Sequence, residues 1–123
     1  MMVQKARLFD DHAIEATMLT EPDPYAVKKL GRKVQNFDND IWNENKVQIV
    51  LDGTFHKFSQ HKHLQDYLLD TGESILVEAS PWDKIWGVGL EAHDERATNI
   101  DEWQGENLLG FILMEVRHRL RSL

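Results

Sequence analysis

The strongest constraint on the fold is a run of apolar residues at helical spacing near the carboxyl end of the chain. Within residues 106–120, apolar side chains recur every three or four positions, which is typical of a helix with one buried face. Arginines near the end of this segment favour the same interpretation, because cations stabilise the carboxyl end of a helix dipole. The positions that share the predicted inner face are Leu109, Ile112, Leu113 and Val116.

Further helices are predicted from capping residues and apolar spacing. Asp23 before Pro24 is typical of a helix start, because the carboxylate can accept a hydrogen bond from the first turn and proline needs no N–H there. Gly31 is typical of the end of the same helix. The ranges expected to be helical are 1–9, 11–19, 24–30, 38–58, 61–70 and 106–120, with a single turn at 101–103.

A small β element is expected between the last two helices. Residues 74–78 (SILVE) are rich in residues that favour strands, and residues 85–88 are expected to form a short second strand after a loop. The chain of 123 residues is long enough for one compact domain and too short for two. The expected fold class is therefore mainly α with a small β element, in a single domain over residues 1–123.

Composition excludes several classes of function. The chain has 14 Lys and Arg against 21 Asp and Glu, and a net charge of −7 disfavours non-specific binding to duplex DNA. It has no cysteine, which excludes disulfides, thiol nucleophiles and cysteine-bound zinc. His61 and His63 lack carboxylates at a metal-ligand spacing, so no metal site is expected. Without a long apolar run or a signal peptide, we expect a cytoplasmic protein with no membrane contact.

The segment 76–89 is the most informative stretch for function. It is expected to present Trp82 and Trp86 beside the carboxylates of Glu78 and Asp83, with glycines close by. Indole faces stack well on nucleobases, and glycines let a ligand approach the backbone. The alternative is that the tryptophans only fill the core, which composition alone favours.

The chain as a whole resembles the NADAR family (YbiA-like). The resemblance lies in residues 86–89 (WGVG) and 107–117 (NLLGFILMEVR), and in residues 4–6 (QKA), which are similar to the tail of the family's first motif. Residues 30–32 (LGR) and 57–60 (KFSQ) fall at family-like positions in the same order. The resemblance implies a YbiA-like domain that begins inside the first motif, without its Glu-His pair, and is therefore incomplete at its N-terminus.

This resemblance implies hydrolysis of an N-glycosidic bond. Relatives include hydrolases of riboflavin-pathway intermediates, which split a pyrimidine amine from ribose phosphate, and antitoxins that remove ADP-ribose from guanine in DNA. Both reactions break a C1′–N bond through an oxocarbenium-like sugar. They need a hydrogen-bond donor at the leaving base, a carboxylate near C1′ and a positioned water. No cofactor is implied.

Asp83 and Glu78 are the candidate catalytic residues. Asp83 lies between the two tryptophans and is either the carboxylate at the sugar or a turn cap. Glu78 ends an apolar segment, and if buried it would need a cation such as Arg32 or Lys5, so a structural ion pair is the favoured alternative. Val88 stands where some relatives of the family have an aspartate.

The candidate substrate-binding residues come from all parts of the chain. Arg32 and Lys5 are candidates for phosphate contact, against the alternative of simple solvation. Trp86 either stacks on the base or fills the core, and Asn107 either binds the ligand or braces the last helix. The remaining candidates are Gln4, Trp82 and Gly87. The alternative for Gln4 is a solvated amide on a helix surface, and that for Trp82 is a side chain that only fills the core. The alternative for Gly87 is that the backbone conformation requires glycine.

The expected function is therefore cleavage of a nucleotide-like small molecule, a ribosylaminopyrimidine phosphate, or of an ADP-ribosylated DNA base. One alternative is a non-catalytic module that binds ADP-ribose or a nucleotide, which the missing first-motif glutamate favours. Another is an interaction domain whose tryptophan loop is packed shut. The enzyme hypothesis predicts that Trp86, Asp83 and Lys5 converge on one concavity. The sequence leaves the oligomeric state open.

Overall fold

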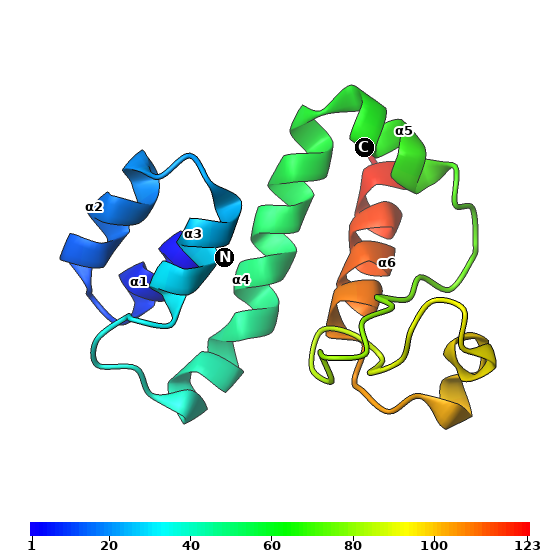
Figure 1. Cartoon of the computed structure of the whole chain (residues 1–123). Helices are drawn as coiled ribbons and strands as arrows, with labels where there is room; N and C mark the ends of the chain where they lie inside the picture. The colour runs from blue at the N-terminus through cyan, green and yellow to red at the C-terminus, as the bar shows by residue number, and fades with distance from the viewer. The chain divides into compact units, whose positions relative to one another are not determined.

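The computed structural model describes residues 1–123 and contains helices and loops, with no strand (Figure 1). The chain divides into two compact units, Met1–Val50 and Leu51–Leu123, called here the N-terminal and C-terminal units. No helix is long and apolar enough to span a membrane. The elements are α1 (Met2–Leu8), α2 (His12–Thr20), α3 (Pro24–Gly31), α4 (Asn39–Gln60), α5 (Lys62–Leu69), the 3₁₀ helices η1 (Glu95–Thr98) and η2 (Ile100–Glu102), and α6 (Leu108–Arg121).

The N-terminal unit is built from α1, α2 and α3, which pack against one another (Figure 1). The predicted cap at Asp23 is confirmed, because Asp23 accepts a hydrogen bond from the N–H of Tyr25 over 3.0 Å. Asp11 caps α2 in the same way, since it accepts a hydrogen bond from the N–H of Ile14 over 3.2 Å. Each bond satisfies one N–H that the first turn of a helix leaves without a partner. The buried core of the unit consists of Ala6, Phe9, Met18 and Val34.

The helix α4 begins where Asp38 accepts hydrogen bonds from the N–H groups of Asp40 and Ile41. The predicted range of 38–58 is therefore confirmed to within two residues, and the unit boundary falls inside this helix.

In the C-terminal unit, α5 packs on α6, and the long segment between them carries η1 and η2 (Figure 1). Arg117 of α6 holds the start of this segment, since its Nη1 donates to Thr71 Oγ1 over 2.8 Å and to the carbonyl of Ser74 over 2.9 Å. The Arg117 side chain is buried, so these bonds replace the water that the guanidinium loses. The predicted inner face of α6 is confirmed for Ile112 and Val116, which are buried.

The predicted β element is wrong, because residues 74–78 and 85–88 form no ladder. The carbonyls of Ile85 and Trp86 accept from the N–H groups of α6, and only one backbone bond, from Val88 to Glu78, joins the two segments. A strand needs a neighbouring strand with a repeated set of backbone hydrogen bonds. The carbonyls of residues 85–87 instead accept hydrogen bonds from the start of α6. The fold class is therefore all α, although residues 74–78 carry a strand-like composition.

Candidate active site

Asp83 organises the turn that carries the two tryptophans of segment 76–89. Its Oδ1 accepts from the N–H of Ile85 over 3.0 Å and from the N–H of Trp86 over 2.8 Å. An aspartate that bonds to the backbone two and three residues ahead stabilises a tight turn. The alternative role of Asp83 as a turn cap is thus present in the structure. Its second oxygen, Oδ2, makes no hydrogen bond and is free to meet a ligand.

The turn is attached to the start of α6 by backbone hydrogen bonds. Leu108 donates to the carbonyl of Ile85 and Leu109 donates to that of Trp86, both over 3.1 Å. Asn107 donates in the same way to Gly87 over 3.0 Å. The first N–H groups of a helix have no partner within the helix, and here the loop supplies them. The position of the turn is therefore coupled to α6, the longer of the two α-helices that lie wholly in the unit.

Asn107 joins the same helix to the segment before the turn. Its Oδ1 accepts from the N–H of Glu78 over 2.9 Å, and its Nδ2 donates to the carbonyl of Leu76 over 3.0 Å. The side chain is fully buried and its backbone is left-handed, with φ of 53°. Asparagine tolerates that conformation better than most residues. In the structure Asn107 braces the loop, and a direct ligand contact by this side chain stays a prediction.

Gly87 lies where the backbones of Glu78 and Asp83 meet. A Cβ at this position would lie 2.8 Å from the Glu78 carbonyl oxygen and 2.9 Å from that of Asp83. No ordinary side chain fits at such distances, so the close approach requires glycine. The structure therefore brings together three of the predicted site residues, Glu78, Asp83 and Gly87, around one point of the loop.

The side chains of this loop differ in their exposure. Trp82 is 93% exposed, whereas Trp86 is half-buried, as are Asp83 and Glu78. The Glu78 carboxylate makes no ion pair or hydrogen bond within the C-terminal unit, and an ion pair with Arg32 or Lys5 of the N-terminal unit stays a prediction. An exposed indole directly before a half-buried aspartate, in a loop that also carries Glu78, suits a ligand that has a flat ring and a centre of positive charge.

Lys5 lies in a different environment, in the N-terminal unit. Its Nζ donates to the carbonyl of Gly31 over 2.8 Å and lies 4.6 Å from the centre of the Phe37 ring and 5.6 Å from that of Trp42. Burial lowers the pKa of Lys5 from its ordinary value, and the ring faces offset part of the lost hydration. The ammonium group of Lys5, a residue of α1, therefore lies at the end of α3, where Arg32 is exposed.

Gln4 is exposed on α1 and makes no hydrogen bond through its side chain. Lys5, Arg32 and Gln4 belong to the N-terminal unit, and Asp83 and Trp86 to the C-terminal unit. Their convergence on one concavity stays a prediction, and so does phosphate contact by the two cations. No group of three or more His, Asp or Glu side chains is placed to hold a metal ion.

A model of the NADAR domain matches residues 1–121, almost the whole chain. This chain belongs to the NADAR domain family. The match confirms the resemblance that the motifs at residues 4–6, 86–89 and 107–117 indicate. In this NADAR domain those motifs contain Asn107, the buried side chain that braces the loop, and Gly87, where two backbone segments approach closely.

Curated relatives agree with this membership. The domain is 46% identical over 119 residues to N-glycosidase R617 of Acanthamoeba polyphaga mimivirus, 37% identical over 121 residues to Protein irg-1 of Caenorhabditis elegans, and 32% identical over 118 residues to Riboflavin biosynthesis protein VVA0006 of Vibrio vulnificus. These matches cover 95%, 97% and 96% of this chain. The chain spans 69%, 57% and 29% of the respective relatives, and so corresponds to part of their length.

Sequence reasoning missed one feature of this NADAR domain, a cavity of about 530 Å³ in the C-terminal unit. It is lined in part by residues 97–100, in a stretch that reads as a polar loop, and by Trp103. None of the predicted site residues lines it. A tryptophan within a polar stretch was the one available signal, because such a side chain needs a place to bury its ring.

Proposed function

We propose that this NADAR domain is an N-glycosidase that hydrolyses the C1′–N bond of a nucleotide-like substrate. The relatives support this activity through their names, as an N-glycosidase and as a riboflavin biosynthesis protein. The single observation on the chain that carries the proposal is the Asp83 turn. It holds one carboxylate oxygen in two backbone bonds and leaves the other free, and the residue directly before it is the exposed Trp82.

The geometry suits a reaction in which positive charge develops on a sugar. As the C1′–N bond breaks, its electron pair leaves with the base nitrogen, which takes up a proton, and C1′ becomes oxocarbenium-like. Water then adds its oxygen to C1′ and loses a proton. The free oxygen of Asp83 would stabilise the cation, and the half-buried Glu78 would orient or deprotonate the water.

Substrate recognition is proposed to rest on stacking and on cations. Trp82 or Trp86 would stack on the base, while Gly87 lets the ligand approach the backbone. Lys5 and Arg32 would contact phosphate, and Gln4 would donate or accept a hydrogen bond. Two substrate classes fit this scheme, a ribosylaminopyrimidine phosphate and an ADP-ribosylated guanine, and we expect the protein to act on one of them.

The experiment that tests the activity is an assay of free base release from both substrates. Asp83→Asn is the informative variant, because asparagine retains the Oδ1 that caps the turn and loses only the charge. We expect turnover to fall by about 10²-fold or more, as when one preorganised electrostatic group is removed, with the substrate affinity little changed. Asp70→Asn is a matched control, since Asp70 is exposed in the same unit and its side chain makes no hydrogen bond.

Three outcomes separate the hypotheses. Release of base that is lost in Asp83→Asn and kept in Asp70→Asn supports the proposal. Full activity of Asp83→Asn would make Asp83 purely structural, and Glu78→Gln is then the next variant. Tight binding of a substrate without turnover would instead support the alternative of a non-catalytic nucleotide-binding module.

A further inference from the structure

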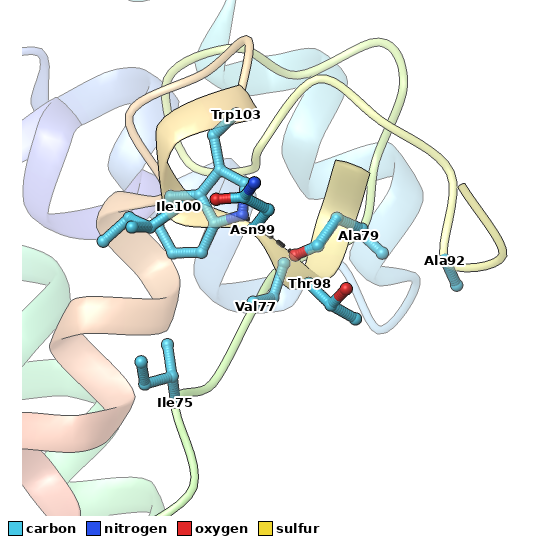
Figure 2. A pocket seen from close by; sticks show the side chains of 9 residues that line it. Ile75, Val77, Ala79, Ala92, Thr98, Asn99, Ile100 and Trp103 are labelled. Carbon is cyan, nitrogen blue, oxygen red and sulfur yellow. Dashed lines mark hydrogen bonds between the residues drawn. The ribbon is translucent and has the colours of Figure 1, made fainter. Parts of the chain in front are cut away.

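The cavity of about 530 Å³ in the C-terminal unit lies between residues 75–79 and the two 3₁₀ helices. Figure 2 shows the lining side chains around it, with Ile75 and Val77 on one side and the Trp103 ring on the other in this view. Its size falls within the roughly 300–1,000 Å³ of small-molecule sites. Ile75 is 62% exposed and Ile100 is 53% exposed, so the rim is apolar and open.

The cavity lies on the other face of residues 75–79 from the braced loop. Every second residue, Ile75, Val77 and Ala79, lines the cavity, whereas Glu78 does not. Alternate side chains of an extended segment point to opposite sides. The cavity is therefore a separate place in the same unit and not an extension of the Asp83 turn.

The lining determines which chemistry the cavity accepts. No charged side chain lines it, so it offers nothing to balance the charge of a phosphate. The Trp103 ring is held in place, because its Nε1 donates to the carbonyl of Ala97 over 2.9 Å, the dashed line in Figure 2. A fixed indole wall among aliphatic side chains suits a flat, uncharged ring.

Two polar side chains of the lining retain hydrogen-bonding capacity. Thr98 Oγ1 donates to the carbonyl of Glu95, and its lone pairs remain available as acceptors. Asn99 uses one amide hydrogen for Glu102, over 3.3 Å, and keeps the second. An acceptor and a donor on neighbouring residues match the alternating donors and acceptors on the edge of a nucleobase.

We propose that this cavity binds a neutral heteroaromatic ring of nucleobase size, with Trp103 as its wall and Thr98 and Asn99 as its polar contacts. The choice of a base among flat rings rests on the proposed function, since a free base is what an N-glycosidase releases. The site itself does not depend on that activity. It has no need of Asp83, and its occupancy is measured without turnover.

The test is a titration followed by nuclear magnetic resonance of the tryptophan indole N–H signals. The protein has four tryptophans, and Trp103→Phe assigns the signal of interest. Adenine at millimolar concentration is expected to shift the Trp103 signal, whereas ribose 5-phosphate is expected to leave it unchanged. Ala79→Leu should weaken the effect of adenine by about tenfold or more, because it overfills a cavity that Ala79 lines.

Ala79 is exposed as well as lining the cavity, so leucine there is compatible with folding. Ala92→Leu, at a second exposed lining position, repeats the test independently, and Ala13→Leu on the exposed face of α2 is the matched control. The inference is overturned if adenine leaves Trp103 unperturbed, or if both cavity variants bind it as well as the control does.

The result also separates this site from the proposed active site. Adenine that shifts Trp82 or Trp86 and leaves Trp103 unchanged would refute the cavity inference and support the tryptophan turn as the base site. Adenine that binds at Trp103 in a protein that releases no base would uphold the cavity site and refute the proposed function.

Discussion

The side-chain oxygen of Asn107 accepts a hydrogen bond from the backbone N–H of Glu78 over 2.9 Å. The amide nitrogen of the same side chain donates to Leu76, so a single asparagine satisfies two backbone groups of the extended segment. In a sheet these groups would pair with a neighbouring strand. One buried side chain at the start of α6 therefore takes the place of the missing strand.

Replacing Asn107 by alanine should lower the unfolding free energy more than the same replacement of an exposed asparagine whose backbone is also left-handed. Asn107→Ala leaves the Glu78 N–H and the Leu76 carbonyl unpaired, which together with the left-handed backbone should lower the unfolding free energy by roughly 2–5 kcal/mol. Asn36→Ala is the control, because Asn36 is exposed and has φ of 62°. Urea unfolding measures both, and equal losses would show that the side-chain bonds contribute nothing.

Hydrogen exchange provides an independent readout of the same brace. In Asn107→Ala the amide of Glu78 should exchange faster, because its acceptor is gone. In Asn36→Ala its exchange should be unchanged. Protection of Glu78 that survives the loss of Asn107 would assign the N–H a different partner in solution.

Two glycines should respond to alanine with opposite signs. Gly87→Ala places a methyl group 2.8 Å from the Glu78 carbonyl oxygen, a backbone atom that cannot easily move, and should destabilise the protein by about 1–3 kcal/mol. Gly53 lies exposed inside α4 with nothing within 4 Å of the added Cβ, so Gly53→Ala should stabilise by about 1 kcal/mol. Thermal unfolding of both variants tests this, and a change of the same sign in both would contradict it.

The helices could be predicted from the sequence because their signals are local. Asp11, Asp23 and Asp38 each cap a helix within three residues of themselves, and apolar spacing identifies the inner face of α6. The β element was not predictable in the same way. Residues 74–78 favour an extended conformation, but whether they become a strand depends on a partner, and that partner proved to be Asn107, about thirty residues away.

The candidate site and the cavity differ in the same way, because only the site depends on local sequence signals. The Asp83 turn follows from Asp83 and the three residues after it, so the sequence indicates it. The cavity beside Trp103 depends on the path of residues 91–103, which have no periodicity to reveal which side chains face inward. The sequence indicates which side chains the loop of residues 76–89 carries. Only the structure shows that Ile75, Val77 and Ala79 line a cavity.

The start of η1 should contain an unusually acidic carboxyl group. Asp94 caps η1 and accepts from the side chain and the N–H of Arg96, and the side-chain bond is the main cause that lowers the pKa of Asp94 to about 2. The folded pKa lies below the unfolded one, so its contribution to stability is present above about pH 4. That contribution should be lost as the pH falls toward 2.

Carbon-detected nuclear magnetic resonance measures this pKa directly. Arg96→Gln should raise the pKa of Asp94 toward its ordinary value of about 3.9. Arg119→Gln, which removes an exposed ion pair with Glu115 on α6, is the control and should leave Asp94 unchanged. An Asp94 that titrates near 4 in the unmodified protein would show that the contact with Arg96 is not maintained in solution.

Alanine substitutions of Trp82 and Trp86 should differ in their effects on the unfolding free energy and on substrate affinity. Trp82 is 93% exposed, so Trp82→Ala should leave the unfolding free energy within about 0.5 kcal/mol, as is usual for surface substitutions. Trp86 is half-buried and its replacement by alanine should destabilise the protein as well. Whichever ring stacks on the base, its loss should weaken substrate affinity by about 1–3 kcal/mol, or roughly 5- to 150-fold.

Calorimetric titration of substrate into proteins that carry Asp83→Asn measures this affinity without turnover. Tyr67→Ala is the matched control, since Tyr67 is 77% exposed in the same unit and is not a candidate for the site. If Trp82→Ala lowers the affinity and Tyr67→Ala does not, the exposed ring is a stacking surface. If neither tryptophan affects the affinity while the substrate still binds, the base is held elsewhere, and the cavity beside Trp103 becomes the place to look for it.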